Sequence, residues 1–196
     1  MLSRGEMYDI VRSWISLPRL LHSLRTAECS AHLAVRFQLS VERAYLAGLA
    51  HDIAREVPES TLIGKASDDE YELLPEDRRY PILLHGRAAA EILRIEYGEK
   101  REDLLQAIRW HTQGSPEMGS LGKALFIADY IEEGRRHITD EERRRILNTG
   151  SLEAMCFEVV ERHRAYLELK GLPTSRRTEA LIERLTEEKN ENGKAG

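Results

Sequence analysis

Residues 46–56 read LAGLAHDIARE, an apolar run of Leu and Ala that leads directly into His51 and Asp52. Leu and Ala favour helix, and Ser40 is a good N-cap for a helix over residues 41–51. Two ionisable side chains therefore stand at the buried end of an apolar helix. A His-Asp pair is too frequent by chance to identify a site on its own, so the rest of the chain has to supply partners for these two side chains.

The composition predicts a single soluble domain. Of the 196 residues, 41% are hydrophobic and 32% are charged, a balance typical of folded globular proteins. No apolar run reaches the roughly 18 residues needed to cross a membrane, and the N-terminus lacks a signal-peptide pattern. Cys29 and Cys156 are too few for a disulfide framework, which predicts a cytoplasmic protein. The net charge of −5 argues against sequence-independent nucleic-acid binding.

Helical periodicity dominates the chain, and the sequence contains no convincing strand and no internal repeat. Apolar residues recur at three- and four-residue steps, and capping residues and glycines divide the chain into segments. The expected helices cover 18–37, 41–51, a short segment opened by Pro58, 84–97, 103–111, 120–133, 140–148, 152–171 and 176–188, with a polar loop before Pro81. The sequence thus predicts an all-α fold, with a single helical bundle at residues 1–188 and a disordered tail at 189–196.

Six ionisable residues lie next to apolar residues in the short sequence segments LLHS, LAHD, LLHG, IRWH and FIAD. Burying a charged group without a partner costs several kcal/mol, so six independent buried sites would be a costly arrangement. Convergence on a metal would compensate all of them together. A single histidine on an apolar face is more often a core residue, and we leave His32, His137 and His163 out of the ligand set because their neighbours are exposed or charged. The predicted metal ligands are His22, His51, Asp52, His85, His111 and Asp129.

At these positions the chain resembles the HD-domain metal-dependent phosphohydrolases. The similar motifs are, in order, Arg19-Leu-Leu-His22, His51-Asp52, Leu84-His85-Gly86, His111-Thr112 and Ala128-Asp129-Tyr130-Ile131-Glu132. The longer words AYLAGLAHDIARE, AIRWHT and GKALFIADYIE are similar to the bacterial YqeK branch, whose members are symmetrical bis(5′-nucleosyl)-tetraphosphatases. The resemblance extends from about residue 8 to residue 185 and implies an HD-domain helical bundle.

The resemblance also implies a dinuclear metal site with one bridging carboxylate. One ion would be held by His22, His51, Asp52 and Asp129, and the other by Asp52, His85 and His111. Asp52 is then the bridging ligand and the expected catalytic residue. The family suggests iron, although nitrogen and oxygen ligands without thiolate also suit Mn, Co, Ni or Zn. Independently of the resemblance, four neutral imidazoles and two carboxylates leave two divalent cations under-neutralised, which suits an anionic polyphosphate.

Cations and small polar groups near the ligands are candidates for phosphate binding, with a solvated surface position as the alternative for each cation. Arg19 matches the family too, but it is also compatible with anchoring its helix to a carboxylate. Trp110 is compatible with either a core position or a stacking platform. The predicted substrate-binding residues are Arg25, Thr112, Gly114, Lys123 and Arg135.

Two departures from the family words concern the substrate rather than the metal. Where the family reads HTTGR, residues 111–115 read HTQGS, and Glu133 replaces the proline of IEP-x-R. Neither departure touches a predicted ligand, so hydrolysis should survive. Both put the family's contacts to the distal phosphates or the second nucleotide in doubt.

The expected activity is metal-dependent, symmetrical cleavage of diadenosine tetraphosphate and related dinucleotides to nucleoside diphosphates. An HD-domain nucleotidase or a phosphodiesterase for other nucleotides is the first alternative. A non-catalytic interaction protein stabilised by metal is the second, and it predicts a closed coordination shell, whereas six ligands shared by two metals leave positions open. No nucleic-acid or membrane partner is expected, and a homodimer is left open.

Overall fold

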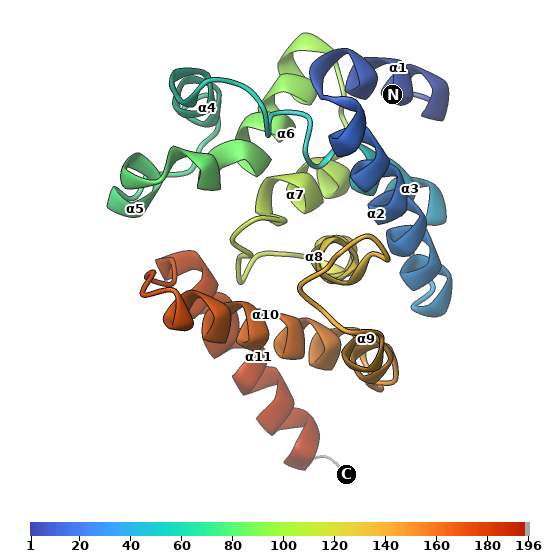
Figure 1. Ribbon diagram of the computed structural model, residues 1–196, viewed down its shortest axis with the longest axis vertical. Helices are drawn as coiled ribbons and strands as arrows, with labels where there is room; N and C mark the ends of the chain where they lie inside the picture. The colour runs from blue at the N-terminus through green and yellow to red at the C-terminus, as the bar shows by residue number, and fades with distance from the viewer. Residues whose placement is uncertain (195–196) are drawn as a thin grey trace.

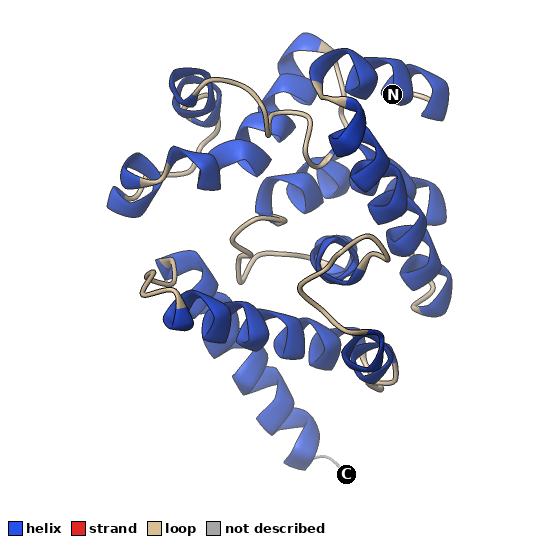
Figure 2. Cartoon of the chain, in the orientation of Figure 1, coloured by secondary structure: helices blue, strands red, loops and turns tan. Residues whose placement is uncertain are grey.

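Eleven α-helices and one short 3-10 helix form the regular structure of residues 1–194, which are the residues that the computed structural model describes. Figure 1 shows their arrangement, and Figure 2 shows only helices and loops in this part of the chain. The all-α prediction is therefore confirmed. In chain order the elements are α1 Arg4–Trp14, α2 Leu17–Arg36, α3 Val41–Ala50, α4 Glu59–Ala66, α5 Pro75–Arg79, η1 Pro81–Leu84, α6 His85–Glu96, α7 Glu102–Trp110, α8 Ser120–Ile131, α9 Asp140–Leu147, α10 Leu152–Leu169 and α11 Arg176–Lys194.

Most helix ends follow the capping signals in the sequence. The Ser40 side chain accepts a hydrogen bond from the first turn of α3, and Thr139 and Glu142 form the expected capping box of α9. Gly98 and Gly171 follow α6 and α10 with φ values of +65°, a conformation that glycine adopts at little cost. Local side-chain chemistry thus determines where these helices begin and end.

The short helix α5 lies in the segment expected to be a loop, and η1 lies between that loop and the helix expected from residue 84. Each has Pro in its first turn, which pre-sets φ for helix, but segments of four or five residues are too short to show periodicity. Their position depends on contacts from elsewhere in the chain, such as the ion pair between Arg177 of α11 and Asp77 of α5 at 3.0 Å. The first helix, α1, precedes the segments whose bounds were predicted from the sequence, and Ser3 and Glu6 form a capping box at its start.

The last helix extends beyond its expected end. The sequence predicts a disordered tail from residue 189, whereas α11 continues to Lys194. Adding residues to an existing helix requires no new nucleation, and Glu187, Glu188 and Lys189 are good helix formers. Residues 195–196 of the predicted tail lie outside the described residues, and the domain limit at 188 stays a prediction.

Helix α8 joins two hydrophobic cores. Leu121 and Leu125 pack in a core formed mainly by α1, α2, α3, α4, α6 and α7, while Phe126 and Ile127 belong to a second core with α9, α10 and α11. Figure 1 shows α8 nearly end-on in the middle of the molecule. An apolar helix that is buried all round can hold a polar residue rigidly between two layers. None of the helices described in residues 1–194 is long and apolar enough to cross a membrane.

A buried carboxylate, Glu99, ties the N-terminus to the α6–α7 connection. Glu99 is 1% exposed and accepts hydrogen bonds from the backbone N–H groups of Leu2, Lys100 and Arg101 at 3.2, 2.9 and 2.9 Å. Burial raises its pKa, but the hydrogen bonds from the Arg101 side chain and from these N–H groups outweigh burial and lower the pKa to about 2. Glu99 is therefore ionised at neutral pH in the folded protein.

We expect Glu99→Gln to lower the free energy of unfolding by about 2–3 kcal/mol at pH 7. The folded-state pKa lies below the ordinary value of 4.5, so this stabilisation is present above about pH 4.5 and is lost as the pH falls toward 2. Denaturant unfolding at pH 7 and pH 3 should show a difference between wild type and variant that shrinks at pH 3. Glu28→Gln, at an exposed position, is the control and should have no effect at either pH.

Candidate metal centre and adjoining cavities

All six predicted ligands meet where α2, α3, α6, α7 and α8 approach one another. His51 and Asp52 directly follow α3, His85 is the first residue of α6, and His111 directly follows α7. Helix ends therefore place four of the six, while the other two lie within α2 and α8. Five side chains are at most 9% exposed, and only Asp129 reaches 22%. The full set is His22, His51, Asp52, His85, His111 and Asp129.

Asp52 lies between two pairs of histidines. The Nε2 atoms of His22 and His51 are 3.2 Å apart, and those of His85 and His111 are 3.0 Å apart. Oδ2 of Asp52 faces the first pair at 3.7 and 3.6 Å, and Oδ1 faces the second pair at 3.1 and 3.8 Å. Asp129 adds a carboxylate oxygen to the first pair only, at 3.0 Å from His22 Nε2 and 3.5 Å from His51 Nε2. The donor atoms thus form two groups that share Asp52.

Three histidines are oriented by the same local hydrogen bond. Nδ1 of His51, His85 and His111 donates to the backbone carbonyl oxygen three residues earlier, at 2.7, 2.6 and 2.7 Å. A histidine that donates through Nδ1 leaves Nε2 as an acceptor, and these three Nε2 atoms point into the cluster. The three carbonyl groups lie at helix ends, where backbone carbonyl oxygens keep lone pairs that the regular helical pattern does not use.

The fourth histidine, His22, is oriented by a carboxylate that our sequence analysis did not single out. Nδ1 of His22 is 3.2 Å from Glu132 Oε1. Glu132 is 2% exposed, and its Oε2 accepts hydrogen bonds from Arg25 Nε and from the Gly134 backbone N–H, both at 2.6 Å. Glu132 is the last residue of the motif ADYIE, and its position three residues after Asp129 was the available signal. This carboxylate–histidine contact is the usual outer support of a metal-ligating histidine.

The cluster is chemically suited to a divalent cation. Four Nε2 lone pairs and two carboxylates converge, and acceptors at such short separations repel one another unless positive charge lies between them. Burial lowers the pKa of His51, but the charges of Asp52 and Asp129 outweigh burial and raise it, so the cluster attracts a proton. Burial lowers the pKa of His111 to about 4, and this imidazole stays neutral. A metal ion can replace the attracted proton, as neutral imidazole and carboxylate ligands require.

Three arginines surround the cluster. Arg19 contacts Asp52 Oδ2 at 2.8 Å, which agrees with the anchoring role considered for it. Arg135 pairs with Asp129 and donates through Nε to the Asp129 backbone oxygen at 2.7 Å. Arg55 lines the adjoining cavity and has no side-chain hydrogen bond or ion pair among the described side chains, residues 1–191. The role of Arg55 was missed from the sequence, although it belongs to the word HDIAR.

The predicted substrate contacts divide into two groups. Thr112 lines the cavity with its Oγ1 3.2 Å from His85 Nε2, and Arg25 and Arg135 also line cavities at the cluster. Lys123 does not, because its Nζ lies 3.4 Å from Glu153 and 3.5 Å from a carboxylate of α11, on another side of α8. The predicted role of Lys123 is wrong because helical periodicity directs it away from Asp129.

Gly114 and Trp110 have structural roles. Gly114 has a φ of +73°, and a Cβ at this position would lie 2.4 Å from Leu181 Cδ2, so it packs against α11 rather than facing a cavity. The predicted role of Gly114 in binding substrate is therefore wrong. Trp110 is 2% exposed and donates through Nε1 to Gln106 at 2.8 Å, which settles the earlier alternative in favour of the core.

The three residues that depart from the family motifs, Gln113, Ser115 and Glu133, line neither cavity. Gln113 is buried and donates through Nε2 to Asp77 Oδ1 at 3.0 Å. Ser115 is buried and Glu133 is exposed, and neither lines a cavity. We expected these departures to alter contacts with the distal phosphates or the second nucleotide. The positions of the three side chains do not support that expectation.

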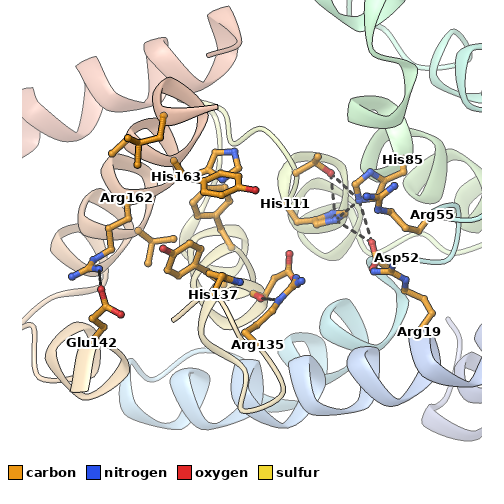
Figure 3. Close-up of a pocket in the computed structure, with 18 residues that line it drawn as sticks. Arg19, Asp52, Arg55, His85, His111, Arg135, His137, Glu142, Arg162 and His163 are labelled. Atoms are coloured by element: carbon orange, nitrogen blue, oxygen red, sulfur yellow. Dashed lines mark hydrogen bonds and ion pairs between the residues drawn. The ribbon is translucent and has the colours of Figure 1, made fainter. Parts of the chain in front are cut away.

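A cavity of about 700 Å³ opens from the metal-ligand cluster toward α10. Figure 3 shows Asp52, His85 and His111 on one side of it and His163 and Arg162 on the other. Its size is typical of small-molecule sites. His163 and the neighbouring His137 line this cavity although they are not part of the metal cluster, whereas the described lining does not include His32.

A second cavity of about 490 Å³ lies on the His22 side of the cluster. Four arginines and two glutamates line it, and three residues are shared with the first cavity. The shared residues are Arg19, Arg135 and His137.

Comparisons with known proteins agree with this geometry. The HD-domain family model matches residues 19–134, a range that includes all six clustered residues. A crystal structure of a Clostridium acetobutylicum protein, described as a predicted HD superfamily hydrolase involved in NAD metabolism, superposes with a TM-score of 0.87 at 29% identity and covers 96% of this chain and 99% of that one.

Similar curated proteins carry one recurring name. The Staphylococcus aureus protein named "Bis(5′-nucleosyl)-tetraphosphatase, symmetrical" is 35% identical over 82% of this chain and 82% of its own length. Proteins of the same name from Halalkalibacterium halodurans and Bacillus subtilis are 34% and 29% identical, over 69% and 79% of this chain and 72% and 82% of their own lengths. The chain thus belongs to the HD-domain family, in the group that contains these bacterial symmetrical tetraphosphatases.

Proposed function

We propose that this protein hydrolyses diadenosine tetraphosphate and related dinucleoside polyphosphates symmetrically, to nucleoside diphosphates. The observation that carries the proposal is the cluster of six candidate ligands centred on Asp52, which opens into a cavity with arginines at its rim. Relatives named symmetrical bis(5′-nucleosyl)-tetraphosphatase support the choice of substrate. A non-catalytic metal site is disfavoured because the donor groups border open cavities of about 700 and 490 Å³.

The donor set suits two metal ions that share Asp52, with iron as our proposed metal. The His22–His51 pair with Asp129 would hold one ion, and the His85–His111 pair the other. Bound divalent ions would supply water activation at neutral pH and stabilisation of negative charge on the phosphates. Nitrogen and oxygen donors also suit Mn, Co, Ni or Zn, so elemental analysis of protein purified without added metal identifies the ion.

The chain's own cations would bind and orient the polyphosphate. Arg55 is free of ion pairs with the side chains of residues 1–191, so its guanidinium can hold phosphate oxygens without giving up any of these partners. Arg19 and Arg135 already pair with Asp52 and Asp129, and they can exchange part of that contact for phosphate when those carboxylates bind metal. Thr112 can donate its hydroxyl proton to a phosphate oxygen at the same rim. Free thiols at Cys29 and Cys156 are consistent with our proposal of a cytoplasmic enzyme.

The position of the cleaved bond in the polyphosphate chain tests this proposal. Cleavage of the central P–O–P bond of diadenosine tetraphosphate should give ADP alone, two per substrate, with neither AMP nor ATP at early times. Hydrolysis in heavy-oxygen water should label the terminal phosphate of one ADP of each pair. Chromatography and mass spectrometry measure both results. Equal early amounts of AMP and ATP would contradict symmetrical cleavage, and phosphate release from mononucleotides alone would favour the nucleotidase alternative.

The outer carboxylate Glu132 gives a further expected result. We expect Glu132→Gln to weaken metal binding about 10- to 100-fold, because the amide no longer carries the charge that holds His22 and Arg25 in place. Metal titration monitored by calorimetry measures this change. Glu133→Gln, at the adjacent exposed residue, removes the same charge and should leave metal affinity unchanged. Equal affinities in the two variants would show that Glu132 has no positioning role.

A further inference from the structure

The two cavities beside the cluster have different walls. The outer wall of the first cavity, formed by α8 and α10, has Tyr166 and Leu169 at its surface and the buried Phe126 and Val159 behind them. Arg162 of α10 also lines this side, where it pairs with Glu142 at 2.8 Å. Figure 3 shows His163 of this wall across the cavity from His85 and Asp52. We call this part of the first cavity the apolar wall, and it consists of Phe126, Tyr130, Val159, His163, Tyr166 and Leu169.

The apolar wall is incompletely covered. Tyr166 is 52% exposed and Leu169 is 86% exposed, although both line a cavity. The rings of Tyr130 and His137 pack edge to face at 4.8 Å, and the ring nitrogens of His163 have no hydrogen-bond partner in the described chain. A flat aromatic ligand with polar edges, such as a nucleobase, would cover the apolar side chains by stacking and could bond to His163.

The second cavity has no such wall. Its lining contains no Phe, Tyr or Trp, and it contains four arginines, the same number as the first cavity. Two glutamates partly balance them, and both are already engaged: Glu132 with Arg25 and His22, and Glu56 with the Ser16 backbone N–H at 2.7 Å and hydroxyl at 2.8 Å. Arg19, Arg25 and Arg135 pair with Asp52, Glu132 and Asp129, and no ion pair of the described side chains involves Arg136. Guanidinium groups without a neighbouring aromatic ring suit phosphate groups rather than a base. The arginines are Arg19, Arg25, Arg135 and Arg136.

The cluster lies between these two environments. His22 lines the second cavity, whereas Asp52 and Asp129 line the first, and Arg19 and Arg135 border both. A polyphosphate chain that extends from one cavity to the other therefore passes the six clustered residues. A molecule bound this way has one end against the apolar wall and the other among arginines.

We propose that the site recognises only one nucleoside of its substrate, at the apolar wall, and holds the other half through phosphates in the second cavity. This inference rests on the proposed function and extends its substrate class to nucleoside 5′-tetraphosphates, which have a single nucleoside. Adenosine 5′-tetraphosphate should be hydrolysed to ADP and pyrophosphate. One water is consumed, the central P–O bond breaks, the leaving diphosphate keeps the bonding electron pair, and the proton of the water is released to solvent.

The first test compares two substrates on the metal-loaded enzyme. We expect kcat/KM for adenosine tetraphosphate to lie within about fivefold of that for diadenosine tetraphosphate, because the absent nucleoside makes no specific contact. The free terminal phosphate also carries extra negative charge toward the arginines. A kcat/KM more than about 100-fold lower for adenosine tetraphosphate would overturn the proposal, because it would show that both nucleosides are bound.

The second test measures binding of ADP and of pyrophosphate by calorimetry. Tyr166→Ala should weaken ADP binding about tenfold and leave pyrophosphate binding unchanged, whereas Tyr166→Phe should retain both. Arg136→Ala should weaken pyrophosphate binding about fivefold, and the matched control Arg164→Ala, outside both cavities, should not. Equal weakening of both ligands by Tyr166→Ala would overturn the assignment of the apolar wall to the base.

The two tests separate this inference from the proposed function. If neither tetraphosphate is hydrolysed, the proposed function fails. The binding measurements still decide the inference, since a base-dependent effect of Tyr166→Ala supports the apolar wall. ADP and pyrophosphate binding that are both insensitive to Tyr166 and Arg136 would overturn it.

Discussion

Asp52→Ala should leave the protein without bound metal and reduce kcat/KM for diadenosine tetraphosphate by about 10⁴-fold or more. The physical reason is that one carboxylate faces both histidine pairs, with Oδ2 at 3.7 and 3.6 Å from His22 and His51 and Oδ1 at 3.1 Å from His85. Its removal takes a negative donor from both groups at once. Elemental analysis of the purified variant, together with steady-state kinetics, measures the two losses.

His85→Ala is the matched comparison, because His85 belongs to only one of the two groups. We expect this variant to lose chiefly one metal equivalent and to keep the ion held by His22, His51 and Asp129. Circular dichroism should show that both variants remain helical. Equal metal contents in Asp52→Ala and His85→Ala would contradict a shared carboxylate and would require a different division of the ligands.

Gly48→Ala should destabilise the fold by about 3 kcal/mol or more and disturb the metal centre as well. A Cβ at Gly48 would lie 2.6 Å from Ala27 Cα and 2.9 Å from Thr26 O, which are backbone atoms of α2. Because backbone cannot move aside, α2 and α3 would have to separate. These helices carry His22 and lead into His51, whose Nδ1 donates to the Gly48 carbonyl oxygen at 2.7 Å.

Gly64→Ala provides the control in another helix. Gly64 is an exposed residue inside α4, and a Cβ there would meet nothing within 4 Å. Alanine should therefore stabilise the protein by about 0.5–1 kcal/mol through helix propensity. Denaturant unfolding of both variants, with and without metal, measures the effects. A Gly48→Ala protein as stable as wild type would show that the α2–α3 contact can relax.

The candidate ligands could be predicted from the sequence because their chemistry is unusual for their surroundings. A histidine or aspartate at the end of an apolar helix, as at His51, Asp52 and His111, needs compensation wherever the helix packs. The capping signals at Ser40 and Thr139 are equally local, since the bonds they make span three residues. Such features depend on neighbours in the chain and are therefore visible without the fold.

Residues whose roles depend on distant partners could not be assigned in this way. Lys123 and Arg135 are both cations on or next to α8, yet one pairs with carboxylates of α10 and α11 and the other with Asp129. Gly114 and Trp110 were similarly ambiguous until the packing of Leu181 and the bond to Gln106 were known. Helix rotation and helix packing decide such cases, and neither is encoded in a short window of sequence.

The sequence by itself determined the all-α class, most helix boundaries and the identity of the six clustered side chains, because each follows from local propensity or from the cost of burying an isolated charge. Only the tertiary structure decided that Asp52 faces both histidine pairs, that Glu132 supports His22 and that Arg55, at the cavity, pairs with no side chain of residues 1–191. It also decided that arginines line both cavities and that aromatic side chains line only the first. These arrangements join residues far apart in the chain, such as His22 and Glu132 at 110 positions, and their geometry is set by how the helices pack.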